Sequence, residues 1–212
     1  MESSWQQLVN NLMASGVLRT PAVVAAFETV DRSDFVLTAL RDQACIDEPV
    51  PIGFGQTVSQ PWTVAFMLEE LQPAIGQKVL DVGSGSGWQT ALLAHIVGLP
   101  TGGGQVIGLE LIPELFQQSV RNIARCNFIT RRSVELHCLN GTKGFPAAAP
   151  FDRIISAAAT ERIPSAWLEQ LKLGGRLVTP VDSTIVVMEK LASNKFETRT
   201  FSGFAFVPFV AE

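Results

Sequence analysis

The sequence predicts an α/β fold built on a doubly wound, mostly parallel sheet of seven strands, with a C-terminal antiparallel hairpin and an N-terminal helical extension. Two observations lead to this class. From residue 78 onward, short apolar and β-branched runs alternate with segments whose apolar residues recur at helical spacing. Four of these runs are almost continuously apolar, as expected for parallel strands that are buried on both faces.

Length and composition agree with one compact domain. The chain has 212 residues, of which 47% are hydrophobic and 17% charged, so apolar material for a large core is available. We therefore expect a single domain over 1–212, in which residues 1–60 form a helical extension and 61–212 form the sheet core.

The charge of the chain argues against several classes of partner. The formal net charge is −4 and the basic residues are scattered, so no nucleic-acid binding is expected, and the tight pair Arg131–Arg132 is better explained as a solvated loop face. Residues 1–16 lack the basic and apolar regions of a signal peptide, and no run of 18 apolar residues occurs. We expect a cytoplasmic protein with no membrane span.

Cysteine and histidine spacing predicts no metal site. The three cysteines are odd in number and have no CxxC spacing, which argues against a disulfide framework and a zinc site. His95 falls in an apolar helical run and His137 in a strand pattern. Both histidines are therefore expected to have structural roles, with no bound metal.

The first fifty residues are predicted to form two or three short helices. Residues 3–16 and 21–30 have apolar side chains at helical spacing, and the second stretch opens with Thr20 as a possible cap and Pro21 at the first helical position. A third short segment follows at 31–36. This region is expected to cover the sheet or the mouth of a site.

Residues 52–61, IGFGQTVSQP, allow two interpretations. One is a glycine turn followed by a helix over 62–71, with Ser59 or Gln60 as the cap and Pro61 in the first turn. The other is a loop shaped to hold a substrate. Both can be true, because one hydroxyl can cap a helix while another faces a ligand. Taken alone the segment favours the cap, and beside the glycine-rich motif below it favours the substrate loop.

The rest of the chain is predicted to alternate strands with helices. Gly174 and Gly175 give the last helix its C-terminal stop. Only residues 192–203 separate the last two strands, so these are expected to form an antiparallel hairpin at one end of the sheet. The expected strands are 78–82, 105–110, 134–138, 153–158, 176–181, 184–190 and 204–210, and the expected helices are 88–98, 112–126 and 163–175.

The most informative motif is VLDVGSGSGWQTALLA at 79–94. Gly83, Gly85 and Gly87 fall between a strand and a helix, where a ligand can approach bare backbone near the helix N-terminus. A dinucleotide fingerprint requires GxGxxG, and its third glycine would fall on Trp88. The motif is therefore not a dinucleotide site.

The motif present is DxGxGxG, which is typical of class I methyltransferases that bind S-adenosylmethionine. Asp81 at the strand end can meet the ammonium group of an amino-acid tail, and loop N–H groups can meet its carboxylate. Glu110 ends the next strand, where an acid can accept bonds from both ribose hydroxyls. Three glycines alone could form a tight turn, but strand, acid, glycines, helix and second acid in this order favour cofactor binding.

Segments spread along the chain carry a more specific resemblance. The chain resembles the protein-L-isoaspartate O-methyltransferase family over almost its full length, and the motif IGxGQTxSQP is not shared by methyltransferases in general. The resemblance implies a Rossmann-like methyltransferase fold with S-adenosyl-L-methionine as cofactor. The segments that carry it, in the family's order, are 52–61, 79–94, 149–164, 174–181 and 206–210.

The resemblance implies a repair activity. The enzyme would transfer a methyl group to the free carboxylate of L-isoaspartyl residues, and of D-aspartyl residues, in damaged proteins or peptides. The ester is a better electrophile for the neighbouring amide nitrogen, so a succinimide forms and can reopen to normal aspartate. Isoaspartyl-containing proteins are thus the expected partners, and a monomer is expected.

The resemblance also assigns site residues. Ser59 and Thr57 would lie beside the acceptor carboxylate, with Ser59 as the active-site residue. The substrate loop would be shaped by Ile52, Gly53, Phe54, Gln56 and Gln60. The cofactor would be held by Asp81, Gly83, Ser84, Gly85, Gly87, Glu110, Asn140 and Gly141.

The chain departs from the family at several positions. The family has GDG where this chain has Leu139, Asn140 and Gly141, and the family's aspartate meets the adenine amino group; Asn140 keeps a carbonyl acceptor. Phe54 and Trp88 stand where tyrosine is usual. An alternative is thus a dedicated carboxyl methyltransferase for an aspartate in one partner, and another is a binding module without turnover.

Overall fold

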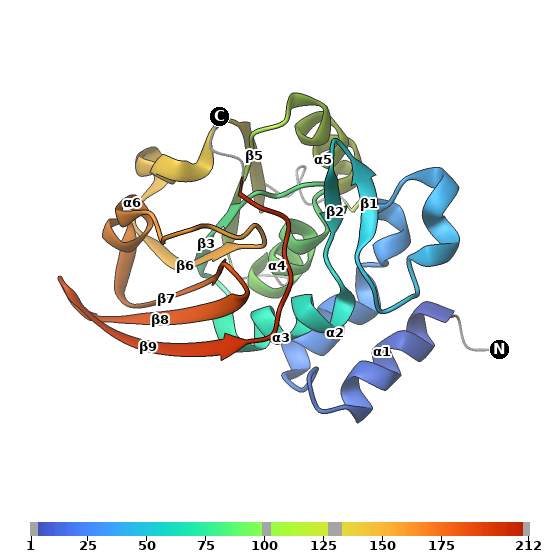
Figure 1. The fold of residues 1–212 in the computed structure, drawn as a ribbon, viewed down its shortest axis with the longest axis horizontal. Coiled ribbons are helices and arrows are strands. Elements are labelled where there is room, and N and C mark those ends of the chain that lie inside the picture. The colour runs from blue at the N-terminus through green and yellow to red at the C-terminus, as the bar shows by residue number, and fades with distance from the viewer. Residues whose placement is uncertain (1–3, 99–102, 127–132, 210–212) are drawn as a thin grey trace.

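A mixed seven-stranded sheet forms the centre of the molecule, and it confirms the predicted fold class (Figure 1). The computed structural model describes residues 4–98, 103–126 and 133–209. The strand order is β5-β4-β3-β6-β7-β8-β9, with parallel pairing from β5 to β7 and antiparallel pairing from β7 to β9. The strands are β3 (Lys78–Val82), β4 (Gln105–Glu110), β5 (Val134–Cys138), β6 (Phe151–Ser156), β7 (Leu171–Val181), β8 (Thr184–Ala192) and β9 (Lys195–Ser202).

Helices cover both faces of this sheet. One apolar cluster joins the first five helices to one face, and a second cluster joins Trp167 of α6 to the other. Neighbouring strand residues divide between the two: Val79 belongs to the first cluster and Leu80 to the second. The helices are α1 (Ser4–Ala14), α2 (Pro21–Thr29), α3 (Pro61–Leu71), α4 (Trp88–Gly98), α5 (Pro113–Arg125) and α6 (Ser165–Glu169), with 3₁₀ helices η1 (Arg32–Phe35), η2 (Thr38–Gln43), η3 (Gly141–Lys143) and η4 (Pro146–Ala148).

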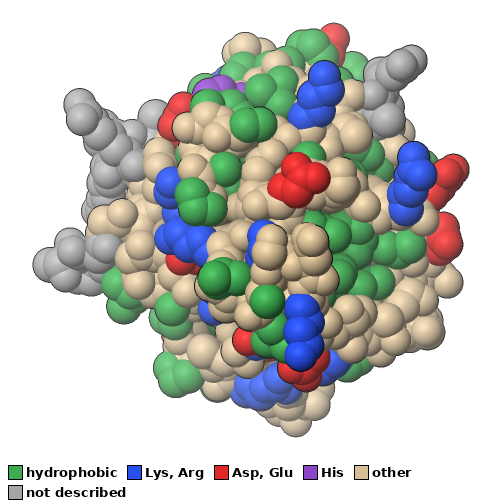
Figure 2. All heavy atoms as spheres, turned by 90° about the vertical axis from the view of Figure 1, so that its left-hand side faces the viewer, with side chains coloured by type: hydrophobic (Ala, Val, Ile, Leu, Met, Phe, Trp, Pro, Cys, Tyr) green, Lys and Arg blue, Asp and Glu red, His purple; other side chains and the backbone are tan. Residues whose placement is uncertain are grey.

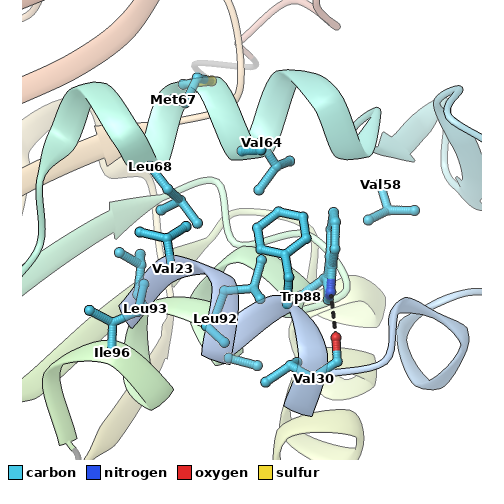
Figure 3. Close-up of a cluster of buried hydrophobic side chains, with 14 of the residues drawn as sticks. Val23, Val30, Val58, Val64, Met67, Leu68, Trp88, Leu92, Leu93 and Ile96 are labelled. Carbon is cyan, nitrogen blue, oxygen red and sulfur yellow. Dashed lines mark hydrogen bonds between the residues drawn. The ribbon is translucent and has the colours of Figure 1, made fainter. Parts of the chain in front are cut away.

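Trp88 lies in the middle of the larger core. Its indole packs edge-on against Trp5 and Phe27, with ring centroids 5.9 and 5.6 Å apart, and its Nε1 donates to the backbone oxygen of Val30 at 3.3 Å. Figure 3 shows the indole among side chains from α2, α3 and α4, with Val58 beside it. The N-terminal helices therefore pack directly on the start of α4.

The predicted strand at 204–210 is wrong. The last strand is β9, which pairs with β8 and lies within the segment expected to be a connection. It is an edge strand with most side chains exposed, so its polar sequence resembles a loop. The described part of 204–210, up to Phe209, is irregular and returns to residues after β6, where Phe209 N donates to Ala159 O at 2.7 Å.

The predicted helix at 163–175 is much shorter than expected. α6 ends at Glu169, and β7 begins at Leu171. Gly174, at φ 71°, lies inside β7, where the pairing with β6 shifts register between Phe151 and Arg153. The glycines accommodate an irregular strand rather than a helix stop. Other predicted elements near the site, at 78–82, 88–98, 105–110, 112–126 and 134–138, are confirmed to within one residue at either end.

The starts of α2 and α3 lack the side-chain caps expected from the sequence. Thr20 precedes α2, but its hydroxyl donates to Glu69 Oε2 at 2.6 Å instead of capping the helix. Gln60 precedes α3 without a side-chain cap, and Asp47 Oδ1 accepts from Trp62 N at 2.8 Å. The expected caps at Thr20 and at Ser59 or Gln60 are therefore wrong: the Thr20 hydroxyl is bonded to Glu69, and the distant Asp47 caps α3.

The surface agrees with the scattered charge of the sequence. On the face shown in Figure 2, acidic and basic side chains are interspersed. The pair Arg131–Arg132 lies outside the described residues. Across the ranges that the structure describes, no helix is long and apolar enough to cross a bilayer.

Candidate active site

A cavity opens at the carboxyl ends of β3 and β4, where the strand order reverses at β3, with β4 on one side of it and β6 on the other. In open α/β sheets ligands bind in this position. The cavity, here called the inner cavity, holds about 620 Å³ of space not filled by atoms, part of it open to solvent. Of the residues assigned from the sequence, its lining includes Ile52, Gln56, Thr57, Ser59, Gly83, Gly85, Glu110 and Gly141.

A small hairpin brings Thr57 and Ser59 to the inner cavity. β1 (Val50–Gly53) and β2 (Gln56–Val58) pair antiparallel, and three consecutive residues from Gly53 have positive φ angles. Val58 points into the core, so its neighbours on the chain face the other way. The segment 52–61 is therefore a hairpin followed by a helix start, and Thr57 and Ser59 are among the residues that line the cavity.

The glycine loop after β3 is tied to β4 by its own backbone. Gly83 N and Ser84 N both donate to Leu109 O, at 2.8 and 2.9 Å. Gly87 N donates to Ser84 O at 2.8 Å. A Cβ at Gly87 would lie 2.9 Å from Ile123 Cδ1, so this glycine is needed for packing against α5.

Glu110 bridges the loop and the end of β4. Its Oε2 accepts from Gly85 N at 2.7 Å and its Oε1 accepts from Ile112 N at 2.9 Å. The carboxylate is 7% exposed and lines the inner cavity. The Gly85 N–H assigned to a ligand carboxylate thus has a protein acceptor, while each carboxylate oxygen keeps a further lone pair for a ligand hydroxyl.

Asp81 is buried beneath the loop and does not line the inner cavity. Its oxygens accept from Thr90 Oγ1 at 2.6 Å and Gln89 Nε2 at 2.7 Å. Burial raises the pKa of Asp81 to about 6, although these two hydrogen bonds lower it and the charge of Glu110 raises it further. The carboxylate therefore holds the first turn of α4 rather than facing the inner cavity.

Asn140 and Gly141 lie at the start of η3. Asn140 Oδ1 accepts from Thr142 N at 2.8 Å and from the Thr142 hydroxyl. The inner cavity is lined on this side by Leu139 and Gly141. A Cβ on Gly141 would lie 2.3 Å from Val82 Cγ1, so this position is restricted to glycine.

Two further cavities meet the inner cavity at Thr57 and Ser59. The outer cavity is lined by Gln60, Trp62, Phe204 and Phe206, among others, and the small cavity lies between β2 and the glycine loop. Both residues line all three cavities. A group held by Ser59 can therefore be reached from two sides.

The aromatic wall of the outer cavity was missed by sequence reasoning. Trp62 and Phe204 have ring centroids 6.2 Å apart, and Phe204 and Phe206 stack at the same distance. The signal in the sequence is the aromatic run at 204–209, which lies in the predicted strand at 204–210. Gly53 and Phe54, assigned to the substrate groove, line none of the three cavities, and Phe54 is 57% exposed at the hairpin tip.

Unpaired polar atoms lie around the small cavity. Ser84 Oγ, Ser86 Oγ and Gln89 Oε1 are buried without a hydrogen-bond partner, and all three residues line this cavity. Buried polar atoms of this kind are uncommon in folded proteins. Together with the single carboxylate of the inner cavity, they fit a ligand that carries hydrogen-bond donors.

Charged groups are few in the inner cavity. Among the described residues that line it, Glu110 is the one ionisable side chain. Within 4–98, 103–126 and 133–209, no group of three or more His, Cys, Asp or Glu side chains could hold a metal ion. The arrangement is suited to binding and orienting ligands.

Comparison with known proteins identifies relatives over the whole chain. Residues 3–212 match the family model "Protein-L-isoaspartate(D-aspartate) O-methyltransferase (PCMT)". A protein-L-isoaspartate O-methyltransferase from Staphylothermus marinus is 39% identical, covering 100% of this chain and 96% of its own length. One from Methanopyrus kandleri is 40% identical, covering 98% and 91%.

Solved structures share the fold. A Plasmodium falciparum structure, described as a protein-L-isoaspartate O-methyltransferase in complex with S-adenosyl-L-homocysteine, superimposes with a TM-score of 0.89 over the full length of both chains at 24% identity. Another protein-L-isoaspartate O-methyltransferase gives 0.85 at 23% identity, covering 96% of this chain and 65% of its own. At these identities the structures support the fold alone.

Proposed function

The chain belongs to the protein-L-isoaspartate(D-aspartate) O-methyltransferase family, and from this membership we propose how its site performs methyl transfer. The enzyme uses S-adenosyl-L-methionine to methylate the free carboxylate of L-isoaspartyl residues in proteins and peptides. The observation that supports this assignment is the inner cavity, in which the glycine loop, Glu110 and the hydroxyls of Thr57 and Ser59 share one lining.

The acceptor needs no general base. A carboxylate with an ordinary pKa of about 4 is already ionised at neutral pH. This agrees with the inner cavity, where Glu110 is the single ionisable side chain among the described lining residues and is itself bonded to two backbone N–H groups. The protein's contribution is then to orient the reacting atoms and exclude water, and orientation alone is worth up to about 7–11 kcal/mol.

Ser59 and Thr57 are proposed to hold the acceptor carboxylate. Both are half-buried, and both lie where the inner and outer cavities meet. A neutral hydroxyl donates one hydrogen bond to a carboxylate oxygen and leaves its other lone pairs available for attack. The peptide that carries the acceptor would lie along the outer cavity, against Trp62 and Phe204.

The cofactor is proposed to lie along the glycine loop, with its ribose at Glu110. When bound, S-adenosylmethionine supplies an electrophilic methyl group on sulfur. Bare backbone at Gly83 and Gly85 permits close approach, and Leu139 and Gly141 border the space for the adenine. Asp81 and Asn140 would support this site indirectly, since Asp81 bonds the first turn of α4 and Asn140 bonds Thr142.

A labelling experiment tests the proposal. The protein is incubated with cofactor labelled in its methyl group and with two peptides that differ only in an isoaspartyl or an aspartyl residue. We expect base-labile label in the isoaspartyl peptide alone. Equal labelling, or none in either peptide, would contradict the proposed function, and label confined to the aspartyl peptide would favour a dedicated aspartate methyltransferase.

A further inference from the structure

Arg32 is a buried cation just outside the three cavities. The residue is in η1 and has no exposed surface. Its guanidinium donates hydrogen bonds to five backbone carbonyl groups from two separate stretches of chain. The acceptors are the carbonyl oxygens of Ala44 (3.2 Å), Ile46 (3.1 Å), Glu48 (2.7 Å), Val58 (3.2 Å) and Ser59 (3.0 Å).

These carbonyl groups replace a carboxylate partner. Among the described residues, no acidic side chain forms a salt bridge with Arg32. Burial lowers the pKa of Arg32 to about 10, although the charge of Asp47 raises it, and this value leaves the side chain charged at neutral pH. A buried charge is unfavourable unless its donors are satisfied, so each carbonyl that moves away leaves the charge less compensated. The guanidinium therefore resists displacement of the chain at Val58 and Ser59.

The same guanidinium contacts the helix that follows the glycine loop. Its carbon lies 5.5 Å from the centroid of the Trp88 ring, in a cation–π arrangement. Trp88 is the first residue of α4, and Figure 3 shows it beside Val58. One side chain thus links the backbone of Ser59 to the element that begins at the end of the glycine loop.

We propose that Arg32 is a positioning residue for methyl transfer, which fixes the Ser59 backbone so that its hydroxyl stays where the inner and outer cavities meet. This inference rests on the proposed function of the site. The glycine loop has separate ties, through Leu109 O and Glu110. Loss of Arg32 should therefore slow turnover far more than it weakens cofactor binding.

Arg32→Lys is an informative substitution because it keeps the positive charge and changes the geometry of the hydrogen-bond donors. A guanidinium presents five donors in a planar fork, whereas an ammonium presents three donors from one atom. Those on Nη1 and Nη2 of Arg32 bind the five carbonyl groups, while Nε has no hydrogen-bond partner among the described residues. Arg32→Lys therefore cannot satisfy both Ser59 O and the carbonyl groups at 44–48. A change in turnover would then report on orientation of the loop rather than on loss of charge.

Lys190 provides a matched control. It is 8% exposed and donates to three backbone carbonyl oxygens near α6, those of Leu168, Glu169 and Leu171. Lys190 lines none of the three cavities. Lys190→Met therefore removes a buried cation that binds carbonyl groups at a distance from Ser59.

The experiment compares wild type, Arg32→Lys and Lys190→Met. Melting temperature, the Kd for S-adenosylhomocysteine and the kcat and KM for an isoaspartyl peptide are measured below every melting transition. For Arg32→Lys we expect kcat at least tenfold lower with the Kd within about threefold of wild type. For Lys190→Met we expect a lower melting temperature with kcat per binding-competent enzyme unchanged.

The other outcomes separate failure of the proposed function from failure of the positioning role. A wild-type protein that methylates no isoaspartyl peptide contradicts the proposed function itself, before Arg32 is considered. An active wild type with equal kcat in Arg32→Lys, or equal losses of kcat and cofactor affinity, overturns only the positioning role. If Arg32→Lys does not fold, Arg32→Gln is measured in its place. Failure of both to fold while Lys190→Met folds would make Arg32 structural and overturn the inference.

Discussion

Replacing Asp81 with asparagine should remove a pH-dependent part of the protein's stability. The carboxyl group is fully buried, and burial raises its pKa to about 6 despite the hydrogen bonds from Thr90 and Gln89. Asparagine has the same shape and does not ionise. The substitution thus isolates the cost of charging this one group.

The magnitude follows from the two pKa values of Asp81. An unfolded aspartate has a pKa of about 3.9, so the folded value is higher by about two pH units, which corresponds to about 3 kcal/mol. Because the folded state binds the proton more tightly, the stability is present at low pH and is lost as pH rises. Most of the loss should develop between about pH 4 and pH 7.

Urea unfolding followed by tryptophan fluorescence measures this effect. The free energy of unfolding of Asp81→Asn is subtracted from that of wild type at each pH, which cancels other titrating groups. We expect the difference to fall by about 2 kcal/mol from pH 4 to pH 7.5, since a small part of the full effect is already lost at pH 4. A flat or rising difference would refute the account of Asp81 as a carboxyl destabilised by burial.

Asp152 supplies a control of opposite sign. Burial raises its pKa, but hydrogen bonds from the Lys172 ammonium and the Lys78 N–H outweigh burial, and the net pKa is lowered. Its ionised form therefore stabilises the folded state above the unfolded pKa, and this contribution is lost as pH falls. The corresponding difference for Asp152→Asn should rise with pH.

Three further substitutions test the site and its supports. Ser59→Ala should retain the melting temperature and cofactor affinity while methyl transfer falls more than tenfold; comparable turnover would exclude a role at the acceptor. In Glu110→Gln, the amide NH₂ faces one of the two backbone N–H donors, so one hydrogen bond is lost at a cost of about 1–3 kcal/mol. Calorimetry should then show a cofactor affinity that is roughly tenfold or more weaker. Gly87→Ala combines a positive φ with a Cβ 2.9 Å from Ile123 Cδ1, whereas Gly16→Ala has a positive φ but a Cβ that meets nothing within 4 Å. Gly87→Ala should therefore lower the free energy of unfolding by about 2 kcal/mol more than Gly16→Ala does. Equal losses in the two variants would show that the contact with Ile123 contributes nothing.

Local patterns allowed most of the sheet core and the glycine loop to be predicted. β3, the loop after it and α4 are contiguous in sequence, so the apolar run, the glycines and the helical spacing identify them together. Glu110 follows from the same logic, because parallel neighbours end at the same edge of a sheet. Such features depend on neighbours within a few residues.

Features set by distant contacts could not be predicted in this way. Asp47 caps α3 across 15 residues, and Glu69 binds the backbone of Arg19 and Thr20 across 49 to 50. β9 carries polar side chains because it is an edge strand, whereas the aromatic run after it packs around the outer cavity without forming a strand. Periodicity cannot separate these cases, since exposure and burial depend on the assembled fold.

The bridge made by Glu110 has a consequence for the thermodynamics of ligand capture. One carboxylate already clamps Gly85 and Ile112, so the ordering of this turn is completed when the chain folds. A ligand that binds there loses its own translational and rotational entropy but does not have to order the turn as well. The entropy of association is therefore less unfavourable than it would be for a loop that orders only on contact.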